Sequence, residues 1–218
     1  MDDFAERLAA ATPTPGGGAA AARVGLFATS LLRMVTGITL AKLPPAEVGA
    51  EKTTPASSGQ STAALAIERA VESGRRLGQT FQQLEVEDMA AFQAYLDALR
   101  LPRSTPEEKE RRLAARRSAA SRATEAPLAT MTAARDTLRL CAEVLELSRT
   151  TPLRAESDLG AAVELSHAAF RVAELNVNAN LPELSEDDRQ KALTRWHQLE
   201  EEVQGLYTGL RSTFTTKA

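Results

Sequence analysis

The sequence has one cysteine and two histidines, so the side chains that most often bind zinc are scarce. A lone cysteine, Cys141, excludes a disulfide within the chain and a zinc site built from several cysteines. The two histidines, His167 and His197, are too few for a histidine-rich metal site. We therefore expect no metal and no other cofactor.

Aromatic residues are also few, at 4% of 218 residues, and the formal net charge is -3. Neither a stacking platform nor a strongly basic surface for nucleic acid is expected. The N-terminus begins with acidic residues, unlike a secretory signal. The most apolar stretch, residues 19–43, is interrupted by Arg23 and Arg33, whereas a membrane span needs about 20 mostly apolar residues. These features predict a cytoplasmic protein that binds neither nucleic acid nor membrane.

Alanine is plentiful, and apolar residues recur at helical spacing without convincing strand alternation. The pattern predicts an all-α fold in a single domain, residues 1–218, with Met34, Met131 and Cys141 in the core. Residues 47–61 are predicted to form an exposed, mobile loop, and Pro127 to kink its helix. The predicted elements are a short helix over 3–11 and five long helices over 19–42, 62–99, 105–148, 157–180 and 185–213.

Two of these helices are very long. A helix of roughly 40 residues spans about 60 Å, which is more than a compact monomer of this size needs. An apolar helix face must also be covered along its whole length. We therefore predict a homodimer in which long helices of both copies pack along an apolar seam, related by a two-fold axis.

Three glycines, Gly16, Gly17 and Gly18, follow a Pro-Thr-Pro segment and open the second helix. Glycine lets a backbone approach a ligand closely, and a helix N-terminus favours an anion. Tight helix packing or a turn is the other interpretation. Lys42 ends the same helix, where it can pair with an acidic ligand or complement the helix dipole.

Carboxylates occur at two places of interest. Asp158 follows Ser157 at a helix start, where it can act as a general base or simply complement the helix dipole. Asp88 lies in the middle of a long helix, where a solvated face is the ordinary explanation. Both remain candidates for a site.

Three asparagines alternate near the end of the fifth long helix, at residues 176, 178 and 180. An amide offers a donor and an acceptor and can bind the edge of a heterocycle, whereas helix capping explains one asparagine easily and three poorly. Asp158 and Asn176 are 18 positions apart, which puts them on one face but about 27 Å apart. On one straight helix they cannot both contact one reacting atom. They could instead hold opposite ends of a long ligand, or belong to different sites across a subunit contact.

Taken in order, these stretches resemble the cyclodeaminase/cyclohydrolase family, which comprises formiminotransferase-cyclodeaminase C-terminal domains and stand-alone methenyltetrahydrofolate cyclohydrolases. The resemblance covers almost the whole chain. The stretches that carry it are Pro13–Gly18, Met34–Lys42, Asp88–Pro102, Pro127–Leu128, Cys141–Leu147, Ser157–Gly160 and Asn176–Leu181.

The resemblance implies an all-α fold, self-association and a tetrahydrofolate substrate. It implies that Asp158 is the catalytic carboxylate and that Asp88 belongs to the substrate-binding residues. The amides of residues 16–18 and Lys42 would bind the carboxylates of the glutamate tail. Asn176 and Asn180 would position either the pterin or the protein backbone.

Two functions follow from this resemblance. The first is hydrolysis of 5,10-methenyltetrahydrofolate to 10-formyltetrahydrofolate, or the related cyclodeamination of formiminotetrahydrofolate. The second is a non-catalytic folate-binding or scaffold relative. It is motivated by departures from the family pattern at Gly37, Ala41 and Leu43-Pro44-Pro45. Cyclohydrolase activity is favoured over cyclodeamination because no formiminotransferase domain accompanies this one.

Overall fold

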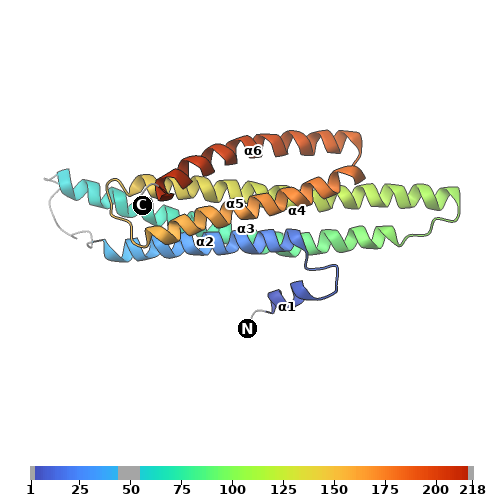
Figure 1. The fold of residues 1–218 in the computed structure, drawn as a ribbon, viewed down its shortest axis with the longest axis horizontal. Coiled ribbons are helices and arrows are strands. Elements are labelled where there is room, and N and C mark those ends of the chain that lie inside the picture. Colours follow the sequence, from blue (N-terminus) through green and yellow to red (C-terminus); the bar gives the residue numbers. More distant parts are fainter. Residues whose placement is uncertain (1–2, 44–54, 216–218) are drawn as a thin grey trace.

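A computed structural model describes residues 3–43 and 55–215, with the side chains of 55–61 and 215 left out. Within these residues the fold is all-α, as predicted, with five long helices and one short N-terminal helix (Figure 1). The elements are α1 Phe4–Ala9, α2 Gly17–Lys42, α3 Pro55–Leu99, α4 Pro106–Leu147, α5 Glu156–Asn180, the 3-10 helix η1 Leu181–Glu183, and α6 Glu186–Thr215.

The helices form a long bundle. α2 packs mainly against α3 and α5, and α4 packs against the other side of the same pair. α6 covers α4 and α5, while α1 lies outside the bundle beside α2. The hairpin of α3 and α4 projects well beyond the start of α2 (Figure 1). One face of α3 therefore continues past the point where α2 stops covering it.

The predicted bounds hold within about two residues except at the start of α3. α3 begins at Pro55, seven residues before the predicted start at Thr62. The predicted loop over 47–61 is therefore wrong for 55–61, and its remainder lies outside the described residues. The start of α4 is fixed by a capping box, in which the Thr105 hydroxyl accepts the backbone N–H of Glu108 at 3.2 Å.

The core is built from a few large side chains and many small ones. Phe81 and Phe170 are almost completely buried, and Met131 and Cys141 are buried as predicted. Gly25 lets α2 approach α3 closely, because a Cβ at this position would lie 2.2 Å from the Phe81 ring. Met34 is 40% exposed, so its predicted place in the core is wrong.

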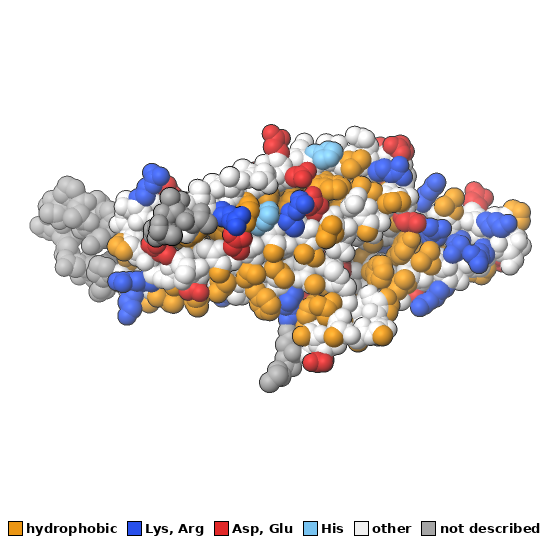
Figure 2. Space-filling view, viewed as in Figure 1, with side chains coloured by type: hydrophobic (Ala, Val, Ile, Leu, Met, Phe, Trp, Pro, Cys, Tyr) orange, Lys and Arg blue, Asp and Glu red, His pale blue; other side chains and the backbone are white. Residues whose placement is uncertain are grey.

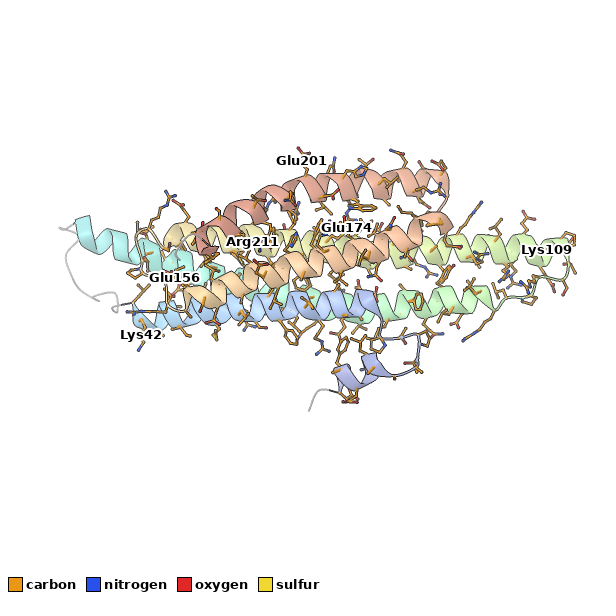
Figure 3. All side chains as sticks on the ribbon, in the orientation of Figure 1. Lys42, Lys109, Glu156, Glu174, Glu201 and Arg211 are labelled. Atoms are coloured by element: carbon orange, nitrogen blue, oxygen red, sulfur yellow. The ribbon has the colours of Figure 1, made fainter. Side chains whose placement is uncertain are left out.

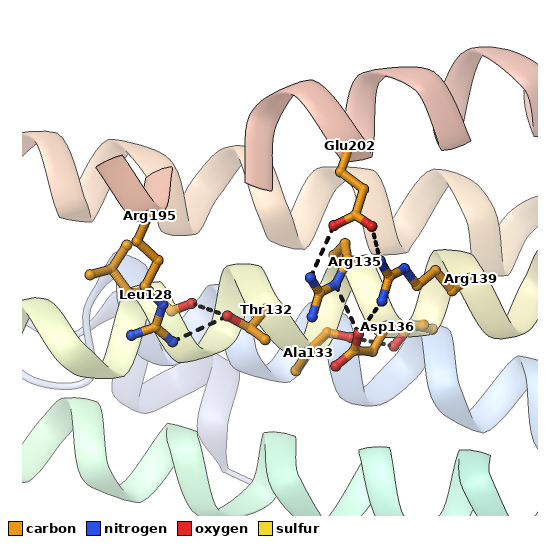
Figure 4. Close-up of polar contacts among 9 residues, drawn as sticks. Leu128, Thr132, Ala133, Arg135, Asp136, Arg139, Arg195 and Glu202 are labelled. Atoms are coloured by element: carbon orange, nitrogen blue, oxygen red, sulfur yellow. Dashed lines mark hydrogen bonds and ion pairs between the residues drawn. The ribbon is translucent and has the colours of Figure 1, made fainter. Parts of the chain in front are cut away.

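Ion pairs attach α6 to α4. Glu202 accepts from Arg135 at 3.0 Å and also from Arg139, while Arg135 binds Asp136 at 2.8 Å (Figure 4). Arg195 adds a hydrogen bond to the Thr132 hydroxyl, at 3.2 Å. The half-buried position of Arg135 makes this network more than a solvated surface pair.

Candidate functional site

Asp88 of α3 reaches the first turn of α2. A Cβ at Gly18 would lie 2.0 Å from Asp88 Oδ1, so only glycine leaves room for the carboxylate. The backbone N–H of Ala19 donates to the same carboxylate. Burial raises the pKa of Asp88, and the hydrogen bond from Ala19 opposes that rise only in part. Asp88 therefore lies in the middle of α3 with its carboxylate half-buried against the N-terminus of α2. The interpretation of Asp88 as part of a solvated face is wrong.

Asn176 of α5 lies on the other side of the same turn. A Cβ at Gly17 would lie 3.2 Å from Asn176 Nδ2 and 3.4 Å from Oδ1. The Asn176 amide donates to the backbone carbonyl of Val172 at 2.8 Å, which fixes its orientation. Three helices thus bring together a carboxylate, an amide and a glycine-rich helix N-terminus. The predicted substrate-binding residues Gly17, Gly18, Asp88 and Asn176 form one group.

An aromatic pair continues this site along α3. Phe92 and Tyr95 lie one and two turns beyond Asp88 on the same helix face, beyond the start of α2. Their ring centroids are 6.4 Å apart. Arg116 of α4 hydrogen-bonds Tyr95 and pairs with Glu183, and its Nε is buried with no partner among the described residues.

Sequence reasoning did not give site roles to Phe92, Tyr95 or Arg116. The spacing of Asp88, Phe92 and Tyr95 was a usable signal, because positions i, i+4 and i+7 share a helix face. The contact between Asp88 and Gly18 was needed to show which face that is.

Asn180 has a structural partner of its own. Pro127 lies inside α4 and lacks the N–H that would bind the Ala123 carbonyl. The Asn180 amide donates to this carbonyl at 3.0 Å. α4 continues as a helix through Pro127, and the end of α5 is fastened to it. This bond explains Asn180 without a substrate.

Lys42 and Asp158 lie at the opposite end of the bundle. The Thr39 hydroxyl accepts the backbone N–H of Arg154 at 3.2 Å, which joins the end of α2 to the start of α5. Figure 3 shows both Lys42 and Glu156 at this end of the bundle. Lys42 is about 37 Å from Gly17 along α2, and Asp158 is about 27 Å from Asn176 along α5.

This separation means that the Gly16–Gly18 amides and Lys42 of one chain cannot bind the same carboxylate. The departures from the family pattern at Gly37, Ala41 and Leu43 also lie toward the Lys42 end, away from Asp88. Among the described residues, no group of three or more His, Cys, Asp or Glu side chains could hold a metal ion.

The fold and site define a helical-bundle protein whose polar side chains meet a glycine-rich helix N-terminus. The sequence profile of the formiminotransferase-cyclodeaminase family matches residues 1–198, and the chain belongs to that family. The predicted resemblance is thereby confirmed.

Three relatives illustrate the match. A methenyltetrahydrofolate cyclohydrolase of Methylorubrum extorquens is 34% identical over 204 residues, covering 92% of this chain and 86% of that protein. A formimidoyltransferase-cyclodeaminase of Gallus gallus is 34% identical over 122 residues, 54% of this chain but 22% of that longer protein. The crystal structure of a formiminotetrahydrofolate cyclodeaminase from Thermotoga maritima superposes with a TM-score of 0.74 at 25% identity, covering 96% of this chain and 92% of that one.

Proposed function

We propose that this protein is a one-carbon tetrahydrofolate enzyme that hydrolyses 5,10-methenyltetrahydrofolate to 10-formyltetrahydrofolate. The cyclohydrolase relative supports this reaction because it matches nearly the whole of both chains. The observation that carries the proposal is the Asp88 carboxylate, which is held beside Gly18 and has a raised pKa. A carboxyl group of this kind is suited to proton transfer nearer neutral pH than an ordinary aspartate.

The chemistry begins at the methenyl carbon, which lies between N5 and N10 and shares a positive charge with them. Water attacks this carbon while Asp88 accepts a proton, giving a tetrahedral hydroxyl intermediate. The C–N5 bond then breaks as N5 receives that proton, and the hydroxyl proton leaves to solvent as the formyl C=O forms. One proton is released overall, and the ionised Asp88 also stabilises the cationic substrate.

The pterin ring is proposed to lie over Phe92 and Tyr95. Aromatic rings offer stacking surfaces for flat heterocycles, worth about 1–3 kcal/mol for a nucleobase. The Asn176 amide, beside Gly17, can supply a donor and an acceptor to the ring edge. The Arg116 guanidinium lies beside Tyr95 and can bind an oxygen of the ligand.

Cyclodeamination of formiminotetrahydrofolate is the second candidate reaction, supported by the Thermotoga maritima structure. In this reaction N10 attacks the formimino carbon and ammonia leaves, so the same carboxylate would move protons between nitrogens. The two reactions are distinguished by substrate and by product, since only cyclodeamination releases ammonia.

A cytoplasmic homodimer remains part of the proposal. The free thiol of Cys141 is buried, which is compatible with a reducing compartment. Apolar side chains on the outer face of α2 are exposed, including Phe27 at 53%. Such a face is typical of an association surface.

The first experiment follows the absorbance of methenyltetrahydrofolate with and without the protein. Loss of the chromophore faster than the spontaneous rate, with 10-formyltetrahydrofolate as product, supports the enzyme. Tight binding without loss would instead support the non-catalytic relative. The same incubation with formiminotetrahydrofolate and ammonia detection decides between the two reactions.

A further inference from the structure

A charged side chain, Arg23, lies on the packed side of α2, a little more than one turn beyond Gly18. α2 is the one helix among the described residues that is long and apolar enough to cross a membrane, by length and composition alone. A charge on its packed side therefore needs a specific partner. That partner is Glu85 of α3, whose two carboxylate oxygens accept from Arg23 Nε and Nη2 at 2.7 and 2.6 Å. The side chains of Arg23 and Glu85 are only 19% and 10% exposed.

Glu85 is also a neighbour of Asp88. The two residues are three positions apart on α3, so their Cβ atoms lie about 5–6 Å from each other on one helix face. This face packs against α2, with Glu85 beside Arg23 and Asp88 beside Gly18. Two ionised carboxylates this close in a partly buried place repel, and each opposes ionisation of the other. Arg23 binds both oxygens of Glu85 and so cancels most of this repulsion.

The short helix α1 closes the ion pair off from water. The Phe4 ring packs on the guanidinium of Arg23, whose central carbon lies 4.4 Å from the ring centroid. Phe4 itself is buried. Figure 2 shows α1 as a separate ridge below α2, at the place that Figure 1 gives it. A shielded pair is screened less than a surface pair, so the loss of either charge should be felt at Asp88.

The other charged groups around Asp88 are exposed or have partners of their own. Arg7 of α1 contacts the residue after Asp88 and pairs with Asp3 at 3.9 Å, and both side chains are exposed. Glu87 of α3 is exposed and accepts from a glutamine at 2.6 Å. Arg116 of α4 pairs with the glutamate of η1, and α5 faces the site with an uncharged amide. Burial, rather than a neighbouring negative charge, is the main cause that raises the pKa of Asp88.

We propose that Arg23 is a positioning residue of this site, which neutralises Glu85 and so lets the Asp88 carboxylate ionise one turn away. The inference rests on the proposed function in one respect, because it takes ionised Asp88 as the group that accepts a proton from water. Arg23 does not touch the substrate in this assignment and acts through Glu85. The same ion pair lies about one turn from the contact between Gly18 and Asp88, so it also helps to fix how α2 sits along α3.

The test is a cycle of three charge-removing variants: Arg23→Gln, Glu85→Gln and the two together. Arg23→Gln leaves an unpaired carboxylate beside Asp88 and should raise the pH midpoint of kcat/KM by about one unit. Below that midpoint the rate should fall about tenfold, while the plateau at high pH stays close to wild type. Glu85→Gln leaves an unpaired guanidinium and should lower the midpoint, and the double variant should restore it. A purely structural role would lower the plateau without moving the midpoint in opposite directions.

Two further variants serve as controls. Arg135→Gln is matched in burial, because the Arg135 side chain is also 19% exposed and binds Glu202 and Asp136 between α4 and α6. Its midpoint should equal that of the wild type, and a shift as large as that of Arg23→Gln would contradict the assignment. Arg23→Lys keeps the positive charge without the two-pronged contact, so it should rescue the midpoint.

The charge effect is also measured without turnover, by NMR titration of the Asp88 side-chain carboxyl, whose signal is identified by its loss in Asp88→Asn. If Arg23→Gln does not fold, Glu85→Gln compared with the double variant still isolates the charge of Arg23. Opposite shifts in a protein without activity would refute the enzyme and retain the effect of Arg23 on Asp88. An active enzyme whose Asp88 titration stays fixed in all variants, with Glu85 taking up a proton instead, would retain the enzyme and refute the inference.

Discussion

Gly18 and Asp88 are in close contact, because the Asp88 carboxylate fills the position that any side chain at residue 18 would need. The Cβ of an alanine there would lie 2.0 Å from Asp88 Oδ1. The contact sets the register between α2 and α3 and holds the carboxylate against the Ala19 N–H. The geometry of the proposed site therefore depends on the absence of a side chain at Gly18.

Gly18→Ala is expected to displace Asp88 and to lower kcat/KM by at least about 100-fold, the lower range of general acid–base catalysis. The matched control is Gly209→Ala in α6, where a Cβ meets nothing within 4 Å. The control should keep wild-type kinetics. Steady-state rates for both variants decide the matter, and an active Gly18→Ala enzyme would contradict the role given to Asp88.

The pH dependence of the rate should follow Asp88. Burial raises the pKa of Asp88, and the base form is needed for water attack. The rate should therefore rise with pH through a pKa above the ordinary aspartate range. A profile of kcat/KM against pH measures this limb, which should be absent from the residual activity of Asp88→Asn.

Asp88→Asn should stabilise the fold at neutral pH although it removes activity. A carboxyl group whose pKa is raised on folding favours the folded state while it is protonated, and this stability is lost as pH rises through the folded-state pKa. The amide oxygen of asparagine can still accept the Ala19 N–H. Thermal denaturation should give a higher Tm than wild type at pH 7 and a smaller difference at pH 4. A lower Tm at pH 7 would be inconsistent with the raised pKa.

Phe92→Ala should weaken binding of tetrahydrofolate by about 5- to 160-fold, the range that corresponds to a stacking contribution of about 1–3 kcal/mol. Trp196→Phe provides a control, since Trp196 bonds Glu174 between α5 and α6, outside the site. Calorimetric Kd values for the two variants test the assignment. Unchanged binding by Phe92→Ala would place the pterin elsewhere.

Asn180 and Pro127 should be coupled in stability. Asn180→Ala leaves the Ala123 carbonyl unpaired and should cost about 1 kcal/mol or more in the free energy of unfolding. In a Pro127→Ala background the restored helical N–H binds that carbonyl, so the same substitution should cost less. Urea denaturation of the four proteins gives the coupling energy. Additive effects would contradict the assigned hydrogen bond.

The helices were predictable because proline, glycine and capping residues mark most of their ends, as Thr105 does for α4. The start of α3 was missed because residues 55–61 are rich in small polar residues that favour loops locally. Met34 was assigned to the core because an exposed apolar face and a buried face have the same apolar spacing along a helix. The approach of Asp88 to Gly18 could not be predicted, since it depends on how far α2 slides along α3.

The sequence predicted which residues belong to the candidate site better than it predicted how those residues are arranged in space. The separation of Asp158 from Asn176 followed directly from helical rise. The grouping of Asp88 with Gly17, Gly18 and Asn176 needed the packing of three helices. The catalytic role of Asp158 stays a prediction, and it is a rival to Asp88.

The most direct test compares Asp88→Asn with Asp158→Asn in the methenyltetrahydrofolate assay. The account predicts that Asp88→Asn lowers the enzyme-dependent loss of chromophore by about 10²- to 10⁴-fold, as removal of a general acid–base does. Asp158→Asn should reduce it much less. A wild-type rate for Asp88→Asn, together with a large loss for Asp158→Asn, would contradict the account and move the chemistry to the other end of the bundle.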